Sequence, residues 1–173
     1  RKFMLDGGNW HLQRASEVKQ DGAHVSSMSF DDTSWITATV PATVLSSYVN
    51  IGALPDPNIS DNLFYISESF FNADFWYRNT FELPQQMVGK RLFLNFDGIN
   101  WKADIYLNGS KIDRMEGAFV RGRTDVTQLL HAGTNVLAVR IVKNAHPGAV
   151  KEKNEINTDF NGGILGADNP TFH

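Results

Sequence analysis

Residues 103–112 contain the pattern that most restricts how this chain can fold. Apolar side chains at Ala103, Ile105 and Leu107 alternate with more polar ones, which places the two sets on opposite faces of a β-strand. Asn108-Gly109 follows directly, and a second run begins at residue 110. An Asn-Gly pair between two such runs is typical of a two-residue type I′ turn, because both central residues of that turn need a positive φ. The segment therefore predicts an antiparallel β-hairpin.

Several further segments have the features of strands. Aromatic residues make up 12% of the chain and charged residues only 20%, a composition that suits half-buried pleated surfaces. The segments between strands are too short for crossover helices, so we expect mostly antiparallel pairing. Many short strands separated by turn residues favour an all-β sandwich or barrel. Besides the hairpin, the expected strands are residues 10–18, 75–83, 91–96, 119–125 and 135–142.

Little of the chain is expected to be helical. Apolar residues recur at helical spacing from Val44 to Ile51, with Thr43 as the N-cap and Gly52 as the C-terminal stop. A second, shorter turn of helix is expected at residues 125–130. The sequence thus predicts one or two short helices beside the strands.

Length and composition exclude several classes of protein. The chain has 173 residues, so we expect residues 1–173 to form a single domain. The absence of cysteine excludes thiol redox chemistry and cysteine-rich zinc modules. A formal charge of −3 is too close to neutral for a dedicated nucleic-acid-binding protein. No apolar run approaches the roughly 20 residues that span a bilayer. The five histidines are scattered, so neither a zinc site nor a cofactor is expected.

An ordered set of segments resembles a known family, the N-terminal sugar-binding domain of glycoside hydrolase family 2. The segments are Val40-Pro41-Ala42-Thr43-Val44, Gly52-Ala53-Leu54-Pro55-Asp56-Pro57, Phe75-Trp76-Tyr77-Arg78-Asn79-Thr80-Phe81, Phe96-Asp97-Gly98-Ile99-Asn100, Ala103-Asp104-Ile105-Tyr106-Leu107-Asn108-Gly109 and Gly133-Thr134-Asn135-Val136-Leu137-Ala138-Val139. The resemblance covers nearly the whole chain. Within the family, the sequence is most similar to the branch of exo-β-glucosaminidases, endo-β-mannosidases and β-mannosidases. The resemblance implies an antiparallel jelly-roll-like β-sandwich of the galactose-binding-domain type.

The resemblance also implies that the catalytic residues lie elsewhere. Members of the family are retaining enzymes, which need two carboxyl groups about 5–5.5 Å apart. In the family both are glutamates on a separate TIM barrel, a fold that needs about 250 residues of its own. We therefore expect no catalytic residue in this chain. Asn154-Glu155 matches the family's acid/base dipeptide only superficially, because it lies in a polar loop and not at the end of a barrel strand.

Two loops are candidates for contact with a sugar. Residues 53–74 form a long irregular stretch, which in a compact domain is usually functional or disordered. By position it corresponds to the family's loop at the rim of the sugar pocket, where amide and carboxylate groups can bind sugar hydroxyls. A second candidate loop lies in the Asn- and Gly-rich region from residue 144 onward. The same side chains can instead serve only to cap turns. The candidate substrate-binding residues are Asp56, Asn58, Asp61, Asn62, Asp168 and Asn169.

Other hypotheses remain open from the sequence. Trp35, Trp76 and Trp101 can stack on sugar rings, although large aromatic residues in alternating strands belong mostly to the core or to interfaces. The chain can also be an autonomous carbohydrate-binding module, or a non-carbohydrate interaction sandwich, since one architecture hosts many functions.

The partners expected from the family are a β-linked carbohydrate, bound through the parent enzyme, and a TIM-barrel domain in the same polypeptide. The chain starts at Arg1 and shows no signal peptide, so we interpret it as a processed product or an excised piece. The family implies a periplasmic or secreted location.

Overall fold

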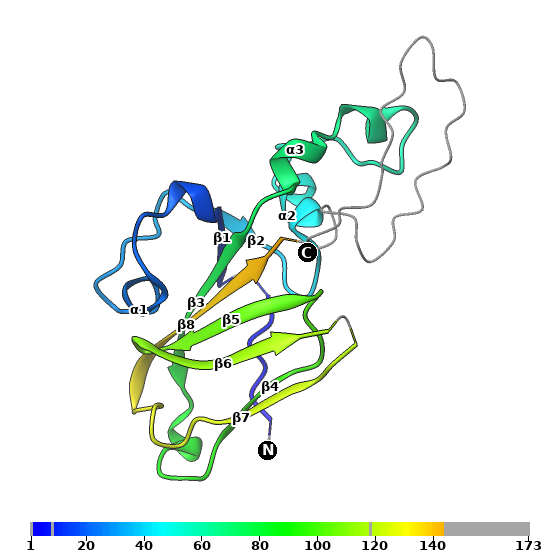
Figure 1. The fold of residues 1–173 in the computed structure, drawn as a ribbon. Helices are drawn as coiled ribbons and strands as arrows, with labels where there is room; N and C mark the ends of the chain where they lie inside the picture. Colours follow the sequence, from blue (N-terminus) through cyan, green and yellow to red (C-terminus); the bar gives the residue numbers. More distant parts are fainter. Residues whose placement is uncertain (1, 8, 118, 144–173) are drawn as a thin grey trace.

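A computed structural model describes residues 2–7, 9–117 and 119–143. Its strands form a six-stranded sheet in the order β2-β1-β3-β8-β5-β6 and a two-stranded sheet, β4-β7, which faces it (Figure 1). All the pairings are antiparallel. The strands are β1 (Trp10–Arg14), β2 (Ile36–Ala38), β3 (Phe75–Leu83), β4 (Phe93–Phe96), β5 (Lys102–Leu107), β6 (Ser110–Glu116), β7 (Gly122–Asp125) and β8 (Gly133–Val142). The predicted all-β antiparallel sandwich is confirmed.

The Asn108-Gly109 hairpin forms as the sequence predicts. Leu107 pairs with Ser110 across the turn, so the loop between β5 and β6 has two residues. Asn108 and Gly109 have φ values of 49° and 86°, the positive values that a type I′ turn requires. The side-chain Nδ2 of Asn108 also donates to the Leu129 carbonyl, which joins this turn to the segment before β8.

The main hydrophobic core lies between the two sheets. Alternate residues of β5, Ala103, Ile105 and Leu107, point into it and are almost fully buried. Side chains from β3 such as Phe75 and Phe81 join them. Burying one side chain of the size of Ile105 contributes about 1.5–3 kcal/mol to folding. The strand periodicity in the sequence therefore reports the side of each strand that faces the core.

The other face of the six-stranded sheet is covered by residues 15–35. Trp35 and Trp76 are buried there in a second apolar cluster. Arg78, only 4% exposed, fastens the covering segment to β3: its Nη1 donates to Asp32 Oδ2 at 2.7 Å. Its Nε and Nη2 donate to the carbonyl oxygens of Val25 and Ser27, both at 2.9 Å.

The expected helix is present. α2 (Val44–Asn50) begins at Thr43, whose side chain accepts a hydrogen bond from the Ser46 amide, and Gly52 follows its end with a φ of 76°. The structure has more short helical segments than the one or two predicted. They are α1 (Gly22–Val25), α3 (Glu68–Phe71) and the 3₁₀ segments Ala15–Glu17, Asn62–Tyr65 and Gln85–Met87.

Several predicted boundaries differ from the structure: the strand predicted for residues 91–96 begins at Phe93, and the one predicted for residues 135–142 begins at Gly133. The first strand ends at Arg14, because a 3₁₀ turn follows and the Ala15 amide donates to the Asp74 carbonyl. The strand predicted for residues 119–125 begins only at Gly122. The short turn predicted for residues 125–130 is present as a single hydrogen-bonded turn, in which the Leu129 and Leu130 amides donate to the Val126 carbonyl, and it does not extend into a regular helix.

Candidate functional site

The candidate sugar-contacting loop, residues 53–74, connects α2 to β3 and projects from one end of the sandwich (Figure 1). Its second half is anchored by apolar packing, because Ile66 and Phe71 are buried. Phe70 packs edge-on against Tyr48 of α2, with ring centroids 5.1 Å apart. The loop is therefore held to the sandwich at its C-terminal side, while the first half carries the polar candidates.

Three of the candidate residues lie together and bond to one another. Asp56 Oδ1 accepts from both the backbone amide and the side-chain Nδ2 of Asn58, each at 2.9 Å. Asn62 Nδ2 donates to the Asp56 carbonyl, also at 2.9 Å. These bonds make Asp56 the centre of a turn, as the chemistry of Asp in loops predicts. Sugar binding by these side chains stays a prediction.

Asp61 forms no hydrogen bond with that cluster in the described part of the chain. Asp61 is exposed. It lies at the N-cap position of the Asn62–Tyr65 segment, but its side chain accepts no capping hydrogen bond there. Asp168 and Asn169 lie outside the described residues.

One residue on the loop was missed by the sequence analysis. Tyr65 is 72% exposed, directly before the buried Ile66. An exposed aromatic ring with a polar end is a type of side chain that can stack on a sugar ring while its hydroxyl binds a neighbouring oxygen. Its position inside a loop of hydrogen-bonding residues was the signal available in the sequence.

The three tryptophans do not form one stacking surface. Trp35 and Trp76 are buried, as their expected role in the core predicts. Trp101, in the connection that leads from β4 to β5, is partly buried. Lys102 Nζ lies 4.4 Å from the centre of its ring.

A small cavity between the sheets is unsuited to a sugar. Its volume is about 70 Å³, and apolar side chains such as Phe81, Leu92 and Leu137 line it. Sugar sites need convergent polar groups, so the loop end of the sandwich remains the better candidate.

Residues 2–7, 9–117 and 119–143 contain no group of three side chains suited to holding a metal ion. Within the same ranges no helix is long and apolar enough to cross a membrane.

The fold and its projecting loop define the class of protein: an antiparallel β-sandwich whose loops at one end can carry a ligand. The sequence matches the family model for the glycosyl hydrolase 2 galactose-binding domain-like domain over residues 10–169. The chain belongs to this family.

Curated relatives are large glycosidases. The chain is 30% identical over 136 residues to the exo-beta-D-glucosaminidase of Amycolatopsis orientalis, an alignment that covers 77% of this chain and 13% of that enzyme. It is 33% identical over 157 residues to the mannosylglycoprotein endo-beta-mannosidase of Lilium longiflorum, covering 86% and 16% of the two chains. The chain thus spans only a small part of the relatives that it matches.

Solved structures agree. The exo-chitosanase of Amycolatopsis orientalis superposes with a TM-score of 0.73 at 26% identity, over 82% of this chain and 17% of that one. The β-D-mannosidase of Dictyoglomus thermophilum gives a TM-score of 0.63 at 28% identity, over 80% and 15%.

Proposed function

We propose that this chain is the non-catalytic N-terminal domain of a retaining β-glycoside hydrolase of the exo-β-glucosaminidase or β-mannosidase type. The observation that carries the proposal is the match to the exo-chitosanase, which covers 82% of this chain but only 17% of that enzyme. A domain that makes up so small a share of a larger glycosidase works together with a separate catalytic domain of the same polypeptide. In this role it packs on a TIM barrel and shapes the pocket for a β-linked sugar.

The loop of residues 53–74 is the part of the domain proposed to reach the pocket. The hydrogen bonds around Asp56 fix its backbone, which lowers the entropy that a sugar contact would cost. Asn58 is exposed, and its side-chain oxygen accepts no hydrogen bond from the described residues. Asn62 and the exposed Tyr65 lie on the same loop.

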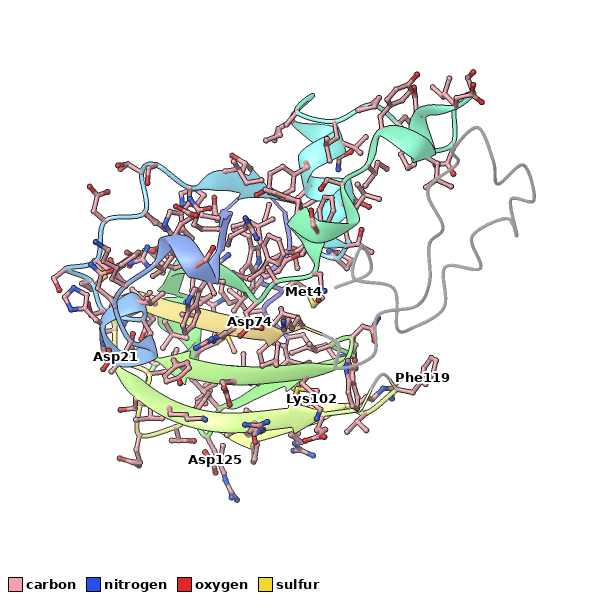
Figure 2. All side chains as sticks on the ribbon, turned by 45° about the horizontal axis from the view of Figure 1, so that its top comes forward. Met4, Asp21, Asp74, Lys102, Phe119 and Asp125 are labelled. Carbon is pink, nitrogen blue, oxygen red and sulfur yellow. The ribbon has the colours of Figure 1, made fainter. Side chains whose placement is uncertain are left out.

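A second exposed element supports packing against another domain. Phe119, in the connection between β6 and β7, is 96% exposed and points away from the sandwich (Figure 2). The neighbouring Val120 is 48% exposed as well, and aromatic side chains are enriched at protein interfaces.

The proposal is tested in the complete enzyme that contains this domain. Asn58→Ala and Asn62→Ala are expected to raise KM for a β-glucosaminide or β-mannoside with little change in kcat, because they remove binding contacts and no reacting group. Asn95→Ala, which alters an exposed asparagine on β4, is the matched control and should leave both constants unchanged. A longer polypeptide without a barrel carrying two glutamates would overturn the proposal.

The isolated chain separates this role from that of an autonomous carbohydrate-binding module. Calorimetric titration with glucosamine, mannose, galactose and their short β-linked oligomers should give no saturable heat if the pocket needs its barrel. Saturable binding that Asn58→Ala or Asn62→Ala abolishes would favour the autonomous module. Loss of binding in Trp101→Ala alone would instead locate the sugar on that ring.

We also propose a periplasmic or secreted location for the parent enzyme, by analogy with polysaccharide-degrading members of the family. A cleavable signal peptide at the start of the full-length polypeptide, followed by recovery of the enzyme outside the cytoplasm, is the expected result.

A further inference from the structure

Arg14, the last residue of β1, carries a charge that nothing in the described part of the chain neutralises. Its side chain is partly buried, and its Nε is shielded from solvent without a hydrogen-bond acceptor among the described residues. The guanidinium carbon lies 4.8 Å from the centre of the Phe70 ring, on α3. A guanidinium stays charged at all ordinary pH values. A shielded donor without an acceptor costs free energy, so this arrangement indicates a missing partner.

Asp74 has a carboxylate near the end of β1, but the hydrogen bonds of this carboxylate go to other residues. The Ala15 amide donates to the Asp74 carbonyl, which places Asp74 next to the end of β1. The Asp74 carboxylate, however, accepts from Arg140 Nε and Nη2 at 3.0 and 2.7 Å and from the Lys143 amide at 3.0 Å, beside the end of β8 (Figure 2). Among the described residues its ion pair is with Arg140, and it forms none with Arg14.

Two tyrosines add hydroxyl groups to the same end of the sandwich. Tyr48 shares the Phe70 ring with Arg14, at a centroid distance of 5.1 Å. Tyr77, on the inward face of β3, is 7% exposed, and its hydroxyl has no hydrogen-bond partner within the described ranges. Burial raises the pKa of Tyr77, and the neighbouring Tyr48 raises it further. Burial also raises the pKa of Tyr48, against the opposing effect of Arg14. Both hydroxyls remain protonated donors.

We propose that Arg14, Tyr48 and Tyr77 bind a carboxylate group at this end of the sandwich. An ionised carboxylate only accepts hydrogen bonds, and it can meet a guanidinium with two parallel bonds. It would supply the acceptor and the negative charge that this cluster lacks. The carboxylate can belong to an acidic sugar or to an acidic side chain of another domain. The inference does not depend on glycosidase activity.

The test follows the Nε–H signals of the arginines by NMR in the ¹⁵N-labelled chain while acetate, D-glucuronate or D-glucose is added at constant ionic strength. The Arg14 signal should move saturably with acetate and D-glucuronate but not with D-glucose. Arg14→Gln should abolish acetate binding, and Tyr77→Phe should weaken it by about threefold or more, since it removes one buried hydrogen-bond donor.

Arg123 provides the matched control. Its guanidinium carbon lies 4.2 Å from the Phe93 ring, and no ion pair of Arg123 is found in the described part of the chain, but its side chain is exposed. Arg123→Gln should leave acetate binding unchanged. Equal, non-saturating shifts of the Arg14 and Arg123 signals would show general attraction of anions and would overturn the proposal, as would saturable binding that survives Arg14→Gln. Arg14→Lys keeps the positive charge but loses the planar guanidinium, so it should bind acetate weakly. Because it is the milder substitution, it also shows whether the loss in Arg14→Gln comes from misfolding.

The two probes distinguish the sources of the carboxylate. Binding of D-glucuronate at least about tenfold tighter than acetate would identify an acidic sugar, because the sugar ring then adds contacts of its own. Equal affinity for acetate and D-glucuronate would show that only the carboxylate is recognised, as expected for an acidic side chain of a neighbouring domain.

Discussion

Arg78 projects from the outer face of β3, and Arg14 from the inner face of β1, so the same sheet holds arginines in two contrasting surroundings. Arg78 is nearly inaccessible, yet its donors reach Asp32 and the backbone carbonyls of the segment that covers it. Arg14 is more accessible, and its guanidinium has a ring contact but no acceptor among the described residues. Satisfied donors fasten one layer of the protein to another, whereas unsatisfied ones mark a place where something can bind.

The largest effect is expected for Arg78→Met. The substitution leaves the mostly buried carboxylate of Asp32 without its guanidinium, and it leaves two carbonyl oxygens without donors. Breaking a buried pair from one side costs about 3–5 kcal/mol. Urea unfolding of both proteins measures the loss. Adding Asp32→Asn to Arg78→Met should recover part of it, and a loss below about 1 kcal/mol would mean that Arg78 does not fasten the segment.

A smaller loss is expected for Gly22→Ala, in the segment that Arg78 holds. A Cβ at Gly22 would overlap the Tyr106 ring, so that ring would have to shift against Trp76, on which it packs. Overpacking of this kind costs about 1–3 kcal/mol. Gly98→Ala is the control, since a Cβ there meets no atom within 4 Å. Equal unfolding midpoints for the two variants would show that the covering segment adapts freely.

Arg14→Met should change stability little, in contrast to Arg78→Met. It removes a partly buried cation that has no counter-ion, and methionine keeps the contact with Phe70. Replacing such a charge with an apolar side chain is expected to be neutral or to stabilise by up to about 1 kcal/mol. A thermal melt of both proteins without added carboxylate is the measurement. Destabilisation as large as that of Arg78→Met would show a partner that the contrast between the two arginines overlooks.

The smallest effect concerns the exposed pair of Arg91 and Asp125. Hydrogen bonds from the Thr127 hydroxyl and amide, followed by that from Arg91, lower the pKa of Asp125 from 3.8 to about 2. Because the folded value is the lower one, the contribution of this carboxylate is fully present above pH 3.8 and is lost as the pH falls through about 2. An NMR titration of the Asp125 side-chain carbon should show the lowered midpoint. Thr127→Val should raise it more than Arg91→Gln does, and the reverse order would contradict the assignment.

Short-range chemistry was predictable from the sequence, and long-range chemistry was not. The Asn108-Gly109 turn, the Thr43 cap and the turn at Asp56 depend on residues two or three positions apart, which a sequence displays directly. The bond from Arg78 to Asp32 joins residues 46 positions apart, and only the order of the strands brings them together. The missing acceptor of Arg14 is still harder to predict, because it depends on which way every neighbouring side chain turns.

The outer edge of β6 also bears on how copies of the chain behave when they are crowded together. β6 ends the six-stranded sheet, and the free backbone groups of an edge strand invite a strand from another molecule, the first step of aggregation. Lys111 and Glu116 are exposed along this edge and form ion pairs with Asp104 and Lys102 of β5. A strand arriving from a neighbour would meet charged side chains of both signs. The edge therefore favours solubility over growth of the sheet.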